Sequence, residues 1–146
     1  MFKRILAAID GSEQSMNAAD VAISLASKYG SELTVLHVVV PFTFNDERNH
    51  PGTGLEEEYR RRIQEQTGKW FEGIKRKAGE NNVKVKTEWT ETSGPVQYEI
   101  TRYADEQKME LIVIGSKGRP GIERLYLGSV ASAVLMYASC PVLVVR

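Results

Sequence analysis

Three glycines and a serine at fixed spacing form the part of this chain best suited to chemistry. Two residues separate Gly115 from Gly118, and nine more precede Gly128 and Ser129. Glycine lets backbone N–H groups approach an anion without a Cβ in the way, and a helix N-terminus adds unpaired N–H donors with partial positive charge. This glycine motif therefore favours a phosphate-binding site, to which Arg119 adds a positive charge.

The segments on either side of the glycine motif predict how it is positioned. Leu111 to Ile114 is a continuous apolar run, typical of a strand buried on both faces of a parallel sheet. From Ser129 to about Ser139, apolar residues recur at helical spacing. The motif thus joins the end of a strand to the start of a helix through a long loop. The Ser129 hydroxyl either donates to a phosphate, caps the helix, or does both.

The rest of the chain alternates between strand-like and helix-like patterns, which predicts a parallel sheet covered by helices. Its 146 residues suit one domain, 1–146, with a single core. Thr53 and Glu56 form a capping-box pattern before the second helix. The expected elements are a strand from Lys3 to Ile9, a helix from Glu13 to Tyr29 capped by Ser12, a strand from Glu32 to Val39, a helix from Leu55 to Ala78 with Trp70 and Ile74 on its inner face, an edge strand from Val83 to Trp89, a helix that begins at Gly94-Pro95, and a last strand from Val142 to Val145.

Composition and charge argue against several classes of partner. Nineteen basic residues balance nineteen acidic ones, so nucleic acid is a poor candidate partner. The apolar segments are too short for a secretion signal or a membrane span, so we expect a cytoplasmic protein and no membrane partner. Cys140 is the single cysteine, which excludes an internal disulfide, and we expect it to be a small packing residue.

The glycine motif resembles the nucleotide-binding motif of the universal stress protein family. The resemblance continues, in the family's order, through ILAAIDGS at Ile5 to Ser12, LTVLHV at Leu33 to Val38 and PVLVVR at Pro141 to Arg146. It implies an α/β fold with one doubly wound, five-stranded parallel sheet of strand order 3-2-1-4-5 and helices on both faces. In that order the first and fourth strands are neighbours, and ligands bind outside their C-terminal ends.

The resemblance also implies a ligand, ATP with Mg²⁺ or Mn²⁺, between Asp10 and the glycine motif. Asp10 would accept hydrogen bonds from ribose hydroxyls or help to hold the cation, and the alternative is a carboxylate that stabilises the turn before the first helix. Val38 matches the position at which the family reads adenine with backbone groups. The complete set of expected nucleotide-binding residues is Ala8, Asp10, Val38, Ile114, Gly115, Gly118, Arg119, Gly128, Ser129 and Val130.

The implied function is a nucleotide-dependent stress-response or regulatory module that binds ATP rather than turning it over. Fast phosphoryl transfer needs a positioned base or water-orienting group, and the motif shows no dedicated set of these. A slow ATPase or phosphotransferase is one alternative, and an interaction module of the same fold without nucleotide is another. The last strand, Val142 to Val145, would lie at a sheet edge, where the resemblance implies a homodimer.

Overall fold

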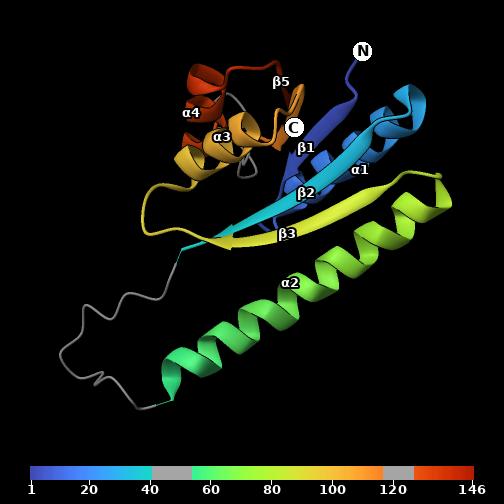
Figure 1. Ribbon diagram of the computed structural model, residues 1–146. Helices are drawn as coiled ribbons and strands as arrows, with labels where there is room; N and C mark the ends of the chain where they lie inside the picture. Colours follow the sequence, from blue (N-terminus) through green and yellow to red (C-terminus); the bar gives the residue numbers. More distant parts are fainter. Residues whose placement is uncertain (41–53, 117–126) are drawn as a thin grey trace.

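Strands and helices alternate along the chain, as the sequence patterns predict (Figure 1). The computed structural model describes residues 1–40, 54–116 and 127–146. The ends of the expected elements shift by a few residues, and the edge strand begins at Val85 instead of Val83. Within the described residues the elements are β1 (Arg4–Ala8), α1 (Glu13–Tyr29), β2 (Glu32–Val39), α2 (Leu55–Glu80), β3 (Val85–Glu91), α3 (Val96–Glu106), β4 (Leu111–Gly115), α4 (Ser129–Tyr137) and β5 (Val142–Val145).

The described strands form one parallel sheet in the order β3-β2-β1-β4-β5. The expected doubly wound fold is therefore confirmed, with β1 at the centre and β3 and β5 at the edges. Ala8 of β1 lies opposite both Leu36 of β2 and Ile114 of β4. Because β1 and β4 send their connections to opposite faces, a crevice opens at their C-terminal ends.

Each face of the sheet carries its own apolar core, because neighbouring residues in a strand point to opposite faces. Ile5 and Val35 pack with α1 and α2 on one face. Ala8, Val38 and Ile114 pack with α3 and α4 on the other. Three of the expected nucleotide-binding residues therefore share the face that α3 and α4 cover (Figure 1).

Glycine occupies the cap position of two helices for which the sequence suggested hydroxyl residues. Ser12 caps α1 as expected, with its hydroxyl accepting from the Ser15 N–H at 3.2 Å. Thr53 lies outside the described residues, and Gly54 holds the N-cap of α2 without a side-chain hydrogen bond. Gly128 likewise holds the N-cap of α4, so the interpretation of Ser129 as the cap is wrong.

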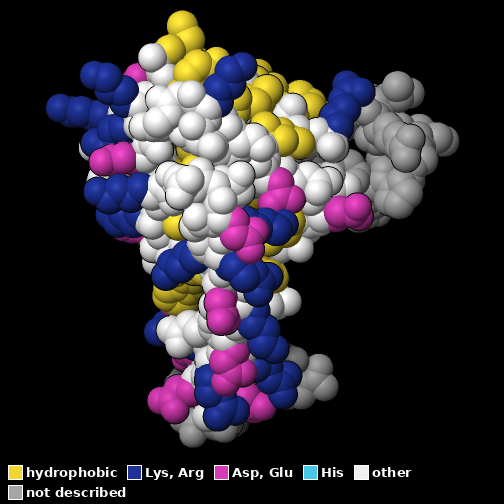
Figure 2. Space-filling view, turned by 90° about the vertical axis from the view of Figure 1, so that its right-hand side faces the viewer, with side chains coloured by type: hydrophobic (Ala, Val, Ile, Leu, Met, Phe, Trp, Pro, Cys, Tyr) yellow, Lys and Arg dark blue, Asp and Glu magenta, His cyan; other side chains and the backbone are white. Residues whose placement is uncertain are grey.

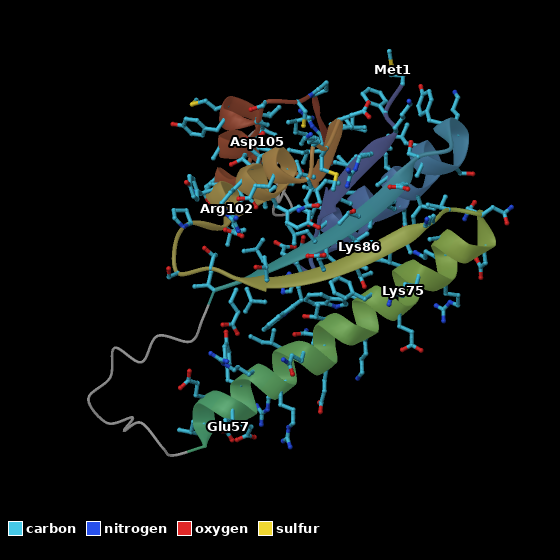
Figure 3. All side chains as sticks on the ribbon, in the orientation of Figure 1. Met1, Glu57, Lys75, Lys86, Arg102 and Asp105 are labelled. Carbon is cyan, nitrogen blue, oxygen red and sulfur yellow. The ribbon has the colours of Figure 1, made fainter. Side chains whose placement is uncertain are left out.

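Helix α2 is long and mostly exposed. Of its 26 residues, Thr67, Ile74 and Ala78 are the buried ones. Figure 2 shows acidic and basic side chains interspersed along the lower part of the molecule, where α2 begins, and Glu57 and Lys75 mark the length of the helix in Figure 3. The outer face of α2 is therefore a solvated, charged surface, and only a narrow stripe of its side chains is buried against the rest of the protein.

A glycine inside α2 offers a test of this packing. Apart from its chain neighbours and the nearby backbone of α2 itself, no atom lies within 4 Å of the place where a Cβ of residue 68 would stand, so Gly68→Ala meets no obstacle. We expect it to raise the free energy of unfolding by about 0.5–1 kcal/mol in urea denaturation, because alanine loses less backbone freedom on folding. Gly30→Ala is the control: its space is also open, but the φ of +66° opposes a side chain, and stability should fall. Equal shifts would contradict this explanation.

Candidate functional site

A pocket of about 110 Å³ opens at the C-terminal ends of β1, β2 and β4. Its floor is apolar, its rim carries the polar residues Asp10 and Ser12, and helices α1, α3 and α4 all begin beside it. Six expected residues are brought together here: Ala8, Asp10, Val38, Ile114, Gly115 and Val130. Six further residues complete the lining: Ile9, Ser12, Ser15, Leu36, Val96 and Ile100.

The two ends of the glycine motif lie next to each other. The N–H of Gly128 donates to the carbonyl oxygen of Ser116 at 2.9 Å, which brings the start of α4 to the end of β4. The first hydrogen bond within α4 runs from Ser132 N–H to the Gly128 carbonyl, so the N–H groups of Ser129 and Val130 precede it. Gly118 and Arg119 lie outside the described residues, and their roles stay predictions. Ser129 is among the described residues, but the role of its hydroxyl as a phosphate donor also stays a prediction.

Asp10 stabilises the turn between β1 and α1. Its Oδ1 accepts from the Ser12 N–H at 2.9 Å, and its own N–H donates to the Ser15 hydroxyl at 3.2 Å. The alternative role considered for this residue, a turn carboxylate, is therefore confirmed. The carboxylate stays exposed at the rim of the pocket. A carboxylate has about four lone-pair sites, so accepting in the turn is compatible with a ligand role.

Gly115 has a packing role that the sequence did not reveal. A Cβ on this residue would lie 2.7 Å from the Gln14 carbonyl carbon and 2.8 Å from the Ser15 nitrogen. The first turn of α1 thus packs directly on the end of β4. This close approach places Ser15 in the wall of the pocket, so Gly115 shapes the site through the helix as well as through its own backbone.

The remaining lining residues needed long-range information to be identified. Val96 and Ile100 read as inner-face residues of a helix, which they are, since both pack in the α3 and α4 core. Only the position of α3 relative to β1 and β2 makes them part of the pocket wall. The sequence signal for Val96 is Gly94-Pro95, because it starts α3 at the same edge of the sheet where the glycine motif starts α4.

Cys140 lies outside the pocket and packs against the α3 and α4 core, as expected for a small packing residue. Burial raises the pKa of its thiol, and the nearby Asp105 carboxylate raises that pKa further. Across residues 1–40, 54–116 and 127–146, no three His, Cys, Asp or Glu side chains gather where they could hold a metal ion. In the same ranges, no helix combines the length and the apolar character that crossing a membrane requires.

Comparison with known sequences identifies one family. The family model described as "Universal stress protein family" matches residues 1–146. Universal stress protein YxiE of Bacillus subtilis is 36% identical over 150 residues, covering 100% of both chains. Universal stress protein MJ0531 of Methanocaldococcus jannaschii is 36% identical over 148 residues, covering 100% of this chain and 83% of that protein. The similarity therefore extends over the whole chain.

Solved structures show the same fold. The structure of hypothetical protein MJ0577 superposes with a TM-score of 0.78 at 28% identity, covering 99% of this chain and 96% of that one. A universal stress protein in complex with cAMP gives a TM-score of 0.70 at 21% identity, covering 99% and 97%. One from Archaeoglobus fulgidus in complex with dAMP gives 0.65 at 20%, covering 100% and 98%. At these identities, the last two support the fold alone.

Proposed function

Because the chain belongs to the universal stress protein family, we propose that it binds ATP with Mg²⁺ or Mn²⁺ in the pocket described above and acts as a nucleotide-dependent regulatory module. One observation carries the proposal: the pocket joins an apolar floor to a polar rim beside the first turn of α4. A nucleotide has the same division, with a flat base at one end and charged phosphates at the other. The complexes with cAMP and dAMP are examples of adenine nucleotides held by this fold.

Each part of the nucleotide has residues suited to it. Ala8 and Ile114 would line the part of the pocket that holds the base and ribose, and backbone groups of Val38 would read the adenine. Asp10 at the rim would accept from ribose hydroxyls. The N–H groups at the start of α4, with the Ser129 hydroxyl, would donate to phosphate oxygens, because a helix N-terminus carries partial positive charge.

The donor set at the rim also suits a divalent cation. Mg²⁺ is usually held by one or two carboxylates together with the phosphates of its substrate. The Asp10 carboxylate is exposed on the side of the pocket where the glycine motif begins. A bound cation would supply positive charge to the phosphates, and Asp10 would anchor it to the turn before α1.

Calorimetry on the nucleotide-free protein with magnesium tests this proposal. Val96→Trp would fill the pocket, because Val96 is half-buried in its wall. The matched control is Tyr98→Trp in the same turn of α3, where the side chain is 65% exposed and outside the pocket lining. We expect ATP binding in the wild type and in the control, and loss of binding in Val96→Trp. Absence of binding by ATP, ADP and AMP, or an unaffected Val96→Trp variant, would overturn the site.

Binding without fast turnover is part of the proposal. The same samples can be assayed for release of inorganic phosphate from ATP. We expect the wild type to release no more than the Val96→Trp variant. Release of phosphate above that level would favour the slow ATPase over a module that only binds ATP. A cytoplasmic location stays a prediction that the structure does not address.

The second part of the proposal is a homodimer that pairs along β5. This strand lies at the edge of the sheet, where backbone groups are open to another strand. Leu143 on β5 is 38% exposed, and Met136 and Tyr137 of the adjacent α4 are 74% and 69% exposed. A second copy related by a two-fold axis would cover this surface.

Light scattering after size-exclusion chromatography checks the dimer. We expect the wild type to elute as a dimer at micromolar concentration and Leu143→Lys to elute as a monomer, because a charge on an edge strand opposes pairing. Tyr98→Lys, which adds the same charge on exposed α3, should leave the dimer intact. A monomeric wild type would refute the dimer and leave the nucleotide site unaffected.

A further inference from the structure

Trp70 of α2 packs against the turn that carries Asp10, from the face of the sheet opposite α3 and α4. Gly11 lies between Asp10 and Ser12 and has a φ of +82°. A Cβ on Gly11 would lie 2.7 Å from Trp70 Cε2 and closer still to two other atoms of the indole ring. The ring therefore occupies the space that the side chain of any residue other than glycine at position 11 would need.

A second contact holds the same turn through His37 of β2. The His37 ring meets the Trp70 ring edge to face, with centroids 5.3 Å apart and an interplanar angle of 86°. His37 Nδ1 lies 2.8 Å from the carbonyl oxygen of Ile9. Trp70 thus touches Gly11 directly and reaches Ile9 through His37. These two contacts flank Asp10 on both sides along the chain.

The helix that carries Trp70 packs on the core through a small set of side chains that also includes Phe71, Ile74 and Ala78. Its buried side chains are few, and one of them, Thr67, has a buried hydroxyl without a hydrogen-bond partner among the described residues. On β3, the strand beside α2, Trp89 Nε1 is buried and unpartnered within the same ranges. Unsatisfied polar atoms and few apolar contacts mark segments of low local stability. Within this small set of side chains, Trp70 supplies the contact with Gly11 in the turn before α1.

We propose that Trp70 is a positioning residue for the nucleotide pocket, which holds the Asp10 to Ser12 turn in its binding geometry and couples occupancy of the pocket to the seating of α2. This inference rests on the proposed function, because the ligand is the nucleotide assigned there. The coupling is reciprocal by thermodynamic linkage: a helix that orders the turn favours the ligand, and the ligand favours the seated helix. The exposed, charged part of α2 is then the surface that changes when nucleotide binds.

A double-mutant cycle with Mg-ATP as the probe tests the positioning role. By analogy with outer-shell groups at metal sites, we expect Trp70→Leu to weaken ATP binding by about tenfold. Gly11→Ala should also weaken it, because its Cβ meets the ring. In the double variant the strain of a side chain at a φ of +82° remains, but the clash disappears with the ring, so the combined loss should be smaller than the sum of the two single losses. Ile74→Val, a core change in α2 one turn further on, should lower affinity much less than Trp70→Leu, because it keeps the ring that contacts Gly11. Additive losses, or an Ile74→Val loss equal to that of Trp70→Leu, would overturn the role.

Fluorescence gives a readout that a purely structural role would not move. The chain has two tryptophans, so in a Trp89→Phe background only Trp70 emits. We expect Mg-ATP to shift this emission, with a midpoint equal to the calorimetric dissociation constant. If calorimetry shows that this variant binds ATP and the emission does not change, the coupling to α2 is wrong. If the wild type shows no ATP binding by calorimetry, the proposed function itself fails, which separates the two conclusions.

Discussion

Replacing Gly115 with alanine is expected to destabilise the fold and to weaken nucleotide binding together. The φ of Gly115 is not among the positive values in the described residues, so its backbone conformation permits a side chain. The obstacle is space, because the new Cβ would press on backbone atoms of Gln14 and Ser15, which cannot rotate away as a side chain can. Overpacking of this kind costs about 1–3 kcal/mol, and valine in place of alanine would cost more.

Urea denaturation and calorimetry on the same preparation separate the two effects of Gly115→Ala. The first turn of α1 must move to admit the Cβ, and this turn carries Ser12 and Ser15 into the pocket. We therefore expect Gly115→Ala to bind ATP more weakly than the wild type even without denaturant, where the variant is folded. Gly68→Ala, which adds the same methyl group in open space, should be stabilised and bind normally. A Gly115→Ala variant with the wild-type midpoint would show that α1 does not pack on β4 as described.

The floor of the pocket was predictable from the sequence because it depends on local patterns. A buried parallel strand reads as a short apolar run, and its last residues lie at the end where ligands bind. Ala8, Val38 and Ile114 come from three such runs, and the sheet order brings them to one face. Local pattern together with the strand order implied by the resemblance was enough here.

The walls of the pocket were not predictable, because they depend on how far each helix shifts along the sheet. Helical periodicity correctly predicted that Trp70 lies on the inner face of α2. Its contact with Gly11, however, joins residues 59 positions apart and has no signature in either segment. Ser15 likewise read as an ordinary helical residue. Residue preference predicted the Ser12 cap of α1 correctly and missed the caps of α2 and α4, because Gly54 and Gly128 adopt the cap geometry without a side-chain hydrogen bond.

Asp10 has an observed role in the turn and a proposed role at the ligand, and a pair of substitutions distinguishes them. Asp10→Asn keeps an Oδ1 that accepts from the Ser12 N–H, so the turn before α1 should survive and the unfolding free energy should change little. It removes the negative charge, which is what a divalent cation binds. Asp10→Ala removes both, and the lost turn hydrogen bond should cost about 1 kcal/mol of stability.

Calorimetry with and without magnesium then assigns the charge of Asp10 to the metal or to the ribose. If Asp10 holds the cation, Asp10→Asn should weaken Mg-ATP binding by about tenfold, the lower end of the losses seen at metal sites, and leave AMP binding in EDTA nearly unchanged. If Asp10 accepts from ribose hydroxyls, ATP and AMP should weaken alike, with or without magnesium. Wild-type affinity for both ligands in Asp10→Asn would confine Asp10 to the turn, because this variant keeps the acceptor for the Ser12 N–H and loses the negative charge.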